Sequence, residues 1–186
     1  MQEALPRLRD DEGFTLIELM VVVLIIGILM AIAIPTYLGA QQSSQDRVTQ
    51  SNLKALLTAE LAYFTNNDQF AATTNSSLSS FKAYEPSLAP LLTGSAPSGP
   101  STRSNGIFIS VASVGGISSQ AFCGFEYSAS GKIFGVEQIE AGTAIGSYFY
   151  VGLTGSSIPT TCATPPTTGG SLSAGGWSQN PSSVGF

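Results

Sequence analysis

The sequence predicts an α+β fold, in which one long N-terminal helix packs on a three- to four-stranded antiparallel sheet followed by a loop-rich C-terminal region. Three observations support this prediction. Residues 14–34 are apolar except for Thr15 and Glu18. Apolar residues then recur at spacings of three and four over residues 48–64, which indicates an amphipathic helix. Beyond residue 106, segments rich in β-branched and aromatic residues alternate with turn signals.

The apolar segment opens the predicted helix and is long enough to cross a bilayer. As a helix, residues 14–34 span roughly 31 Å, which is about the thickness of one hydrocarbon core. Glu18 lies inside this segment, and a carboxylate there is costly unless it is paired, so it is a candidate functional residue. A plain membrane anchor is one interpretation, with Glu18 reaching the headgroups. A secretory signal cut after the small residues 31–33 is another.

The residues around the start of this segment resemble the type IV prepilin signature. Gly13 precedes the expected cut, Phe14 is then the first residue of the mature chain, and Glu18 is the fifth. The resemblance implies that a prepilin peptidase cleaves after Gly13 and methylates the amine of Phe14. The acidic residues 10–12 depart from the basic residues that many such leaders carry at this place.

The resemblance also implies roles for three residues within the helix. Glu18 would pair with the amine of Phe14, in its own chain or in a neighbouring subunit, and so fix the axial register of a filament. Gly27 is a poor helix former, and Pro35 cannot donate a hydrogen bond to the preceding turn. In related pilins the stretch between such residues can unwind during assembly; a mild kink is the structural alternative.

The helix is expected to continue to about residue 64, with a turn at residues 66–68. Its second half is apolar on one side only, and Asn52, Lys54, Thr58 and Glu60 lie largely off the apolar stripe. Such a helix, over residues 15–64, would be roughly 75 Å long. Residues 71–106 are predicted to form a long loop, with a short helix or strand near residues 78–84.

Four strand candidates follow, at residues 107–114, 120–127, 132–137 and 148–151, and residues 128–131 give a hairpin signal. The aromatic residues of these segments are expected to form core rather than a ligand platform. The carboxylates of the sheet region are expected to face solvent. They are Glu126, Glu137 and Glu140.

Composition excludes several classes of function. The chain has no histidine, which removes Ser-His and Cys-His nucleophile pairs and histidine-containing zinc sites. No basic patch indicates nucleic-acid binding. There is no aspartate after Asp68, so no calcium site is predicted. We therefore expect no catalytic residue, no metal and no cofactor.

The two cysteines, Cys123 and Cys162, are either one disulfide or two buried thiols, and export to an oxidising compartment favours the disulfide. Many pilins close a C-terminal loop with one disulfide, so the resemblance supports this pairing. Residues 154–186 are otherwise low in complexity and rich in turn residues.

Together these features predict a leader at 1–13, a membrane and filament-core helix half at 14–35, an amphipathic half at 36–66, and a head at 67–186. The resemblance implies a type IV pilus subunit for motility, adhesion or DNA uptake. Its partners would be copies of itself, the peptidase, an assembly platform and an ATPase. The precursor would lie in the cytoplasmic membrane with its N-terminus inside, and the filament would be extracellular. A minor pilin or pseudopilin of a secretion or competence machine, and a membrane-anchored exported protein, are the alternatives.

Overall fold

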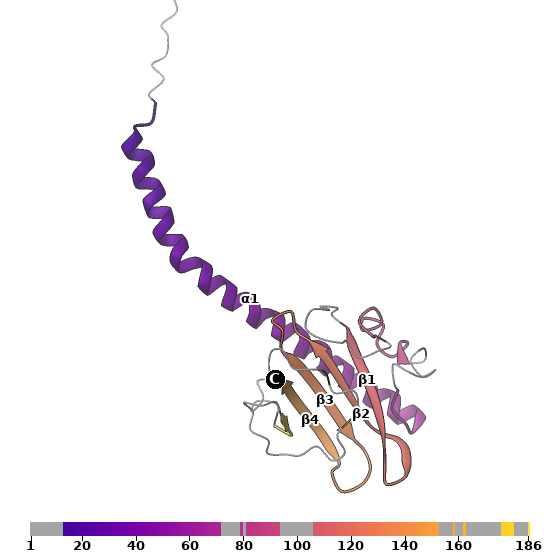
Figure 1. Ribbon diagram of the computed structural model, residues 1–186. Helices are drawn as coiled ribbons and strands as arrows, with labels where there is room; N and C mark the ends of the chain where they lie inside the picture. The colour runs from indigo at the N-terminus through magenta and orange to yellow at the C-terminus, as the bar shows by residue number, and fades with distance from the viewer. Residues whose placement is uncertain are drawn as a thin grey trace, which may run out of the picture. The chain divides into compact units, whose positions relative to one another are not determined.

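The computed structural model describes residues 13–71, 79, 81–93, 106–152, 158, 162, 176–180 and 186. Helix α1, Leu16–Asn67, is followed by the strands β1, Ile107–Val114; β2, Ile117–Tyr127; β3, Ile133–Ile139; β4, Gly146–Gly152; and β5, Gly176–Ser178 (Figure 1). Most of the predicted leader (1–13) and of the predicted loop (71–106) lies outside the described residues, as does much of the C-terminal segment.

The five strands form one antiparallel sheet in the order β1-β2-β3-β4-β5. Neighbours in sequence are neighbours in space, so the sheet is a meander. The β2–β3 hairpin closes at residues 128–131, where Ser128 N donates to Lys132 O at 2.8 Å. Gly131 has φ +92°, a conformation that glycine adopts without strain. A parallel bridge between Leu92 and Ile107 extends the β1 edge.

The chain divides into two compact units, Met1–Ala40 and Gln41–Phe186. The first contributes the first half of α1. The second contains the rest of α1, which lies along one face of the sheet (Figure 1). The core of this second unit joins Leu53 and Leu56 of the helix to Ile109, Phe122 and Val136 of the sheet, all of them fully buried.

The close approach of helix and sheet depends on a glycine. A Cβ atom at Gly124, on the helix-facing side of β2, would stand only 2.2 Å from Cδ2 of Leu56. The opposite face carries a second cluster, with Cys123, Phe125 and Ile133 buried. Residues 121–127 of β2 and all of β3 are therefore buried on both faces.

The structure confirms the predicted α+β class and the four predicted strands, with α1 beginning within one residue and ending within three residues of the predicted bounds. The sheet has five strands rather than three to four, because Gly176–Ser178 adds a short strand beside β4. Near residues 78–84, Ser79 and Phe81 are helical and residues 82–84 form a turn.

Two expectations about carboxylates are wrong. Glu126 and Glu137, expected to face solvent, are 2% and 0% exposed, and Glu60, expected to lie off the apolar stripe, is also fully buried. For Glu126 and Glu137 the reason is that both faces of the sheet are covered, so alternation along a strand does not separate a core side from a solvent side. Glu60 lies on α1 and accepts a hydrogen bond from the backbone N–H of Ala71. Glu140 is only partly exposed.

The strand aromatics belong to the core, as expected. Phe122, Phe125, Tyr127, Phe134 and Tyr148 are buried. Phe149 and Tyr150 are partly buried and pack against core clusters.

Candidate functional site

The first half of α1 exposes its apolar side chains in every direction. Every large apolar residue from Phe14 to Leu38 is exposed, from 44% at Ile26 to 91% at Phe14. By length and composition alone, α1 is able to cross a membrane. Apolar area of this extent needs a cover, which is lipid or other protein.

The start of α1 is held by a reciprocal cap between Thr15 and Glu18. The Thr15 backbone N–H and hydroxyl both donate to Oε2 of Glu18, at 2.8 and 2.7 Å, and the Glu18 N–H approaches Oγ1 of Thr15 at 3.3 Å. This is the capping-box arrangement, which satisfies two donors at a helix N-terminus. The sequence interpretation did not assign this role to Thr15, although its T-x-x-E spacing is the signal for it.

Gly27 and Pro35 lie within an uninterrupted helix, since α1 passes through both residues. Beside the proline, the Thr36 hydroxyl donates to the carbonyl oxygens of Ile32 and Ala33, at 3.2 and 2.9 Å. These two carbonyls follow that of Ala31, to which the nitrogen of Pro35 cannot donate.

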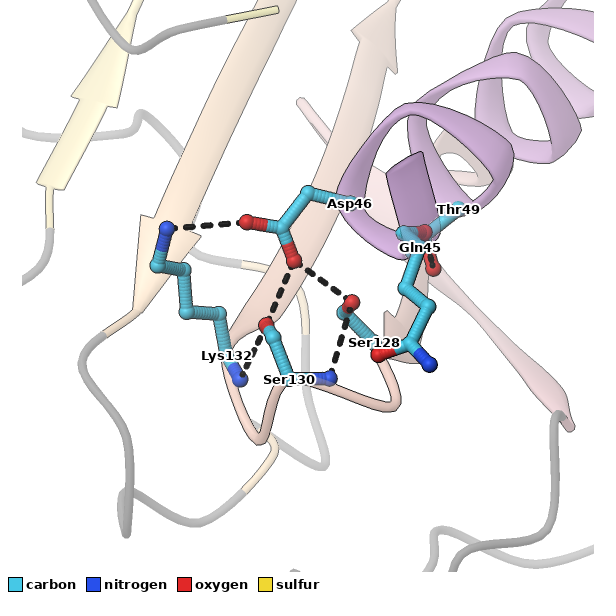
Figure 2. A network of polar contacts seen from close by, with 6 residues as sticks. All are labelled: Gln45, Asp46, Thr49, Ser128, Ser130 and Lys132. Carbon is cyan, nitrogen blue, oxygen red and sulfur yellow. Dashed lines mark hydrogen bonds and ion pairs between the residues drawn. The ribbon is translucent and has the colours of Figure 1, made fainter. Parts of the chain in front are cut away.

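A polar cluster fixes the second half of α1 to the β2–β3 hairpin (Figure 2). Asp46 accepts hydrogen bonds from the hydroxyls of Ser128 and Ser130, at 2.6 and 2.5 Å. It also forms an ion pair with Nζ of Lys132 at 2.8 Å. Burial acts to raise the pKa of Asp46, but Lys132 and the two serines outweigh it and hold the pKa below its usual value. The carboxylate is therefore charged and well partnered at neutral pH.

Three glutamates are buried with incomplete hydrogen bonding. Oε2 of Glu60 accepts from the backbone N–H of Ala71 at 3.0 Å, and Oε1 of Glu126 accepts from Asn52 at 3.1 Å. Within the described part of the chain, the other oxygen of each, and both oxygens of Glu137, have no partner. Burial raises the pKa of Glu60 to about 8, that of Glu126 to about 7 and that of Glu137 to about 8.

Cys123 and Cys162 are joined by a disulfide, with their Cα atoms 5.4 Å apart. Cys123 is buried on the side of β2 that faces away from the helix, and Cys162 packs against the same cluster. The bond therefore ties the C-terminal region to the second strand.

The predicted site residues thus fall into separate places. Gly13, Phe14 and Glu18 lie at the start of α1, Gly27 and Pro35 lie farther along it, and the cysteines lie in the sheet-containing unit. Among the described residues, no three His, Cys, Asp or Glu side chains lie together as a metal site would require.

Comparison with known proteins agrees with the N-terminal signature. Residues 8–34 match the family model of the prokaryotic N-terminal methylation motif. The chain is 51% identical over 61 residues to the type IV major pilin protein PilA of Myxococcus xanthus, which covers 33% of this chain and 28% of that protein. It is 52% identical over 52 residues to a fimbrial protein of Pseudomonas aeruginosa, which covers 28% of this chain and 34% of that protein.

A relative from a secretion machine is also similar. The type II secretion system core protein G of Escherichia coli is 37% identical over 81 residues, which covers 44% of this chain and 54% of that protein. The matched part of the chain thus spans between about a quarter and about half the length of these relatives. No solved structure shows a significant match to the chain. Residues 8–34 thus carry the prokaryotic N-terminal methylation motif, and part of the chain is similar to type IV pilins and to type II secretion core protein G, in agreement with the signature at Gly13, Phe14 and Glu18.

Proposed function

We propose that this chain is a structural subunit of the major-pilin type, which polymerises through the first half of α1 into an extracellular type IV pilus. The observation that carries this proposal is the contrast within α1. Its first half is apolar and exposed throughout, while the second unit has a complete core of its own. A helix half that buries no side chain against the rest of its own chain is suited to being buried among copies of itself.

Processing would begin at Gly13 and Phe14. Cleavage between them creates an amine at Phe14, one residue before the Thr15 cap. Because Thr15 binds Oε2 of Glu18, the other oxygen, Oε1, is left for an amine of the same or a neighbouring chain. A paired carboxylate and ammonium would lower the cost of placing both charges in an apolar bundle, and would set the register between subunits.

The segment between Gly27 and Pro35 would be the adaptable part of the helix. It is continuous in the single chain. However, it joins a poor helix former to a residue that lacks an N–H donor, so its helix is less costly to open than its neighbours. Unwinding here would let a subunit adjust its packing or let a filament stretch.

The partners follow from this proposal. They are copies of the chain, a prepilin peptidase that also methylates Phe14, an inner-membrane platform and an assembly ATPase. The precursor would span the cytoplasmic membrane with its N-terminus inside, and the assembled subunit would be extracellular. In domain terms, 1–13 is the cleaved leader, 14–35 the filament core, 36–66 the amphipathic half and 67–186 the head.

The first test is the intact mass and N-terminal sequence of material sheared from the cell surface. We expect a chain that begins at methylated Phe14 and is two hydrogens lighter than its reduced form. A chain that keeps Met1 and stays in the membrane would indicate a plain anchor instead. A soluble chain that begins near Ile34 would indicate an ordinary secretory signal.

The second test concerns Glu18. Glu18→Gln keeps the size of the side chain but removes the charge that would pair with the Phe14 amine. We expect the variant to be processed but to yield at least tenfold fewer sheared filaments, measured by immunoblot against total subunit. Glu85→Gln, in the second unit, is the matched control and should assemble normally. Normal assembly of Glu18→Gln would count against the pairing.

A pseudopilin of a type II secretion machine is the second candidate, favoured by the similarity to core protein G. Deletion of the gene separates the two. Loss of surface filaments with normal protein secretion would support the pilus. Loss of secretion with filaments intact would support the pseudopilin.

A further inference from the structure

Glu137 lies directly across the sheet from one end of the disulfide. In the antiparallel pairing of β2 with β3, the residue opposite Cys123 is Glu137. Directly opposed residues of an antiparallel pair point to the same face, with Cβ atoms roughly 4.5–5.5 Å apart. Both side chains are therefore on the face that points away from α1.

The two cysteines differ in access. Cys123 is fully buried, whereas Cys162 is partly exposed. An external oxidant would therefore reach Cys162 first and form a mixed disulfide with it. The bond to Cys123 forms in the next step, when the Cys123 sulfur attacks as a thiolate. That thiol must lose its proton in a place where water is scarce.

Glu137 is the acceptor that the fold places there. Both of its carboxylate oxygens are buried and, within the described residues, accept no hydrogen bond. The residue of β1 paired with Cys123 is Ser110, and the residue of β4 paired with Glu137 is Tyr148. The Tyr148 hydroxyl donates to the Ala144 carbonyl at 3.1 Å. The remaining titratable groups described on this face are Tyr127 and Tyr150. Neither a serine nor a tyrosine hydroxyl is a base near neutral pH.

We propose that Glu137 accepts the proton of Cys123 when the Cys123–Cys162 disulfide closes, and returns it when the bond is reduced. The inference concerns maturation of the second unit, so it holds whether or not the subunit forms a pilus. It requires only exposure to a disulfide oxidant of the glutathione or oxidoreductase class.

Closure takes place in two thiol–disulfide exchanges. Cys162 first exchanges with the oxidant disulfide and releases one thiol. The Cys123 thiol then transfers its proton to the Glu137 carboxylate, and the thiolate attacks Sγ of Cys162. The bond between Cys162 and the oxidant sulfur breaks, and the second thiolate leaves and takes a proton from solvent. Glu137 returns its proton to solvent, so the oxidant gains two electrons and the two cysteines lose them.

The acidity of the two groups suits this transfer. Burial raises the pKa of Glu137 to about 8. A raised pKa makes the Glu137 carboxylate a stronger base, so that it is better matched to a thiol. At pH 7 most Glu137 side chains carry a proton, and the charged form that can accept one becomes common near pH 8.

The test follows the closing step in the full chain. Purified protein in detergent is reduced, exchanged into glutathione disulfide at pH 6 to 9, quenched with acid and an alkylating agent, and read by intact mass. Reduced chain, glutathione adduct and closed disulfide have distinct masses. We expect Glu137→Gln to close at least tenfold more slowly near pH 8, where much of Glu137 is charged, and to accumulate the adduct at Cys162. The difference should shrink toward pH 9, where the thiol ionises without help. The difference should also shrink toward pH 6, where Glu137 keeps its own proton.

Glu126→Gln is the matched control, since it also removes a buried glutamate from this sheet but on the face toward α1. It should close at the wild-type rate. Glu137→Met, which is apolar and of similar size, should close as slowly as Glu137→Gln and covers the case in which the amide is poorly tolerated. Closure of both Glu137 variants at the wild-type rate across the pH range would overturn the proposal, as would equal slowing by Glu126→Gln or an adduct found on Cys123.

Discussion

The two halves of α1 belong to one continuous helix but are built for different surroundings. Between residues 16 and 40 no side chain is buried, whereas the half from Gln41 onward buries seven residues, including Leu53, Leu56 and Tyr63. Stability in the second half comes from packing within the chain. The first half has no such packing, so its apolar area is available to lipid or to other subunits. Secondary structure alone therefore does not reveal where a helix is stabilised.

The largest expected effect comes from making the same leucine-to-alanine change in each half of α1. Leu56→Ala removes a fully buried side chain that packs against Gly124, and should lower the free energy of unfolding by about 2–5 kcal/mol. Leu24→Ala makes the same change in the exposed half and should alter it by less than about 0.5 kcal/mol. Urea unfolding, followed by the fluorescence of Trp177, measures both. Equal losses would mean that the first half also stabilises the second unit.

The next effect concerns pH and Glu60. Because burial raises the pKa of Glu60 to about 8, the folded state keeps a proton that the unfolded state has lost above about pH 4.5. This group should therefore lower stability as pH rises from about 4.5 to about 8, by up to about 1.4 kcal/mol per pH unit, and level off above that. Glu60→Gln should reduce the slope, leaving the contributions of Glu126 and Glu137, and should be the more stable protein at pH 8. A variant that kept the wild-type slope in urea unfolding at pH 5 and 8 would exclude this cause.

The smallest effect has the opposite sign with pH. Asp46 has a lowered pKa, so its partners stabilise the fold above the ordinary aspartate pKa and lose this contribution as pH falls through the folded value. Asp46→Asn should cost about 1 kcal/mol at pH 7, since Lys132 is half exposed, and less at acidic pH as the carboxylate becomes protonated. Thermal unfolding at neutral and at acidic pH measures the difference. Ser51→Ala, at an exposed position of the same helix, is the control.

The sequence predicted the parts of the fold that depend on local pattern. The apolar run and the stripe over residues 48–64 gave α1, and β-branched segments gave four strands close to their observed bounds. The short strand Gly176–Ser178 was missed because three residues in a low-complexity segment carry no periodic signal, and its pairing with β4 depends on a distant part of the chain.

The polar contacts were harder to predict from the sequence, because they also depend on distant parts of the chain. The ion pair of Asp46 with Lys132 joins residues 86 apart, so no spacing rule indicates it. The buried glutamates were assigned to solvent because each is polar among apolar neighbours, yet coverage of both sheet faces decides their burial. Thr15 is the exception, since its capping box is local and was available from the sequence alone.

The Cys123–Cys162 bond has a consequence for attack by proteases. A single cut at any of the 39 peptide bonds between the two cysteines leaves both fragments covalently attached. Strands β3 and β4 lie within that interval, so a nicked chain keeps them linked to the sheet on both sides of the cut. A subunit cut once in this region would shed no fragment until a reductant opened the disulfide as well.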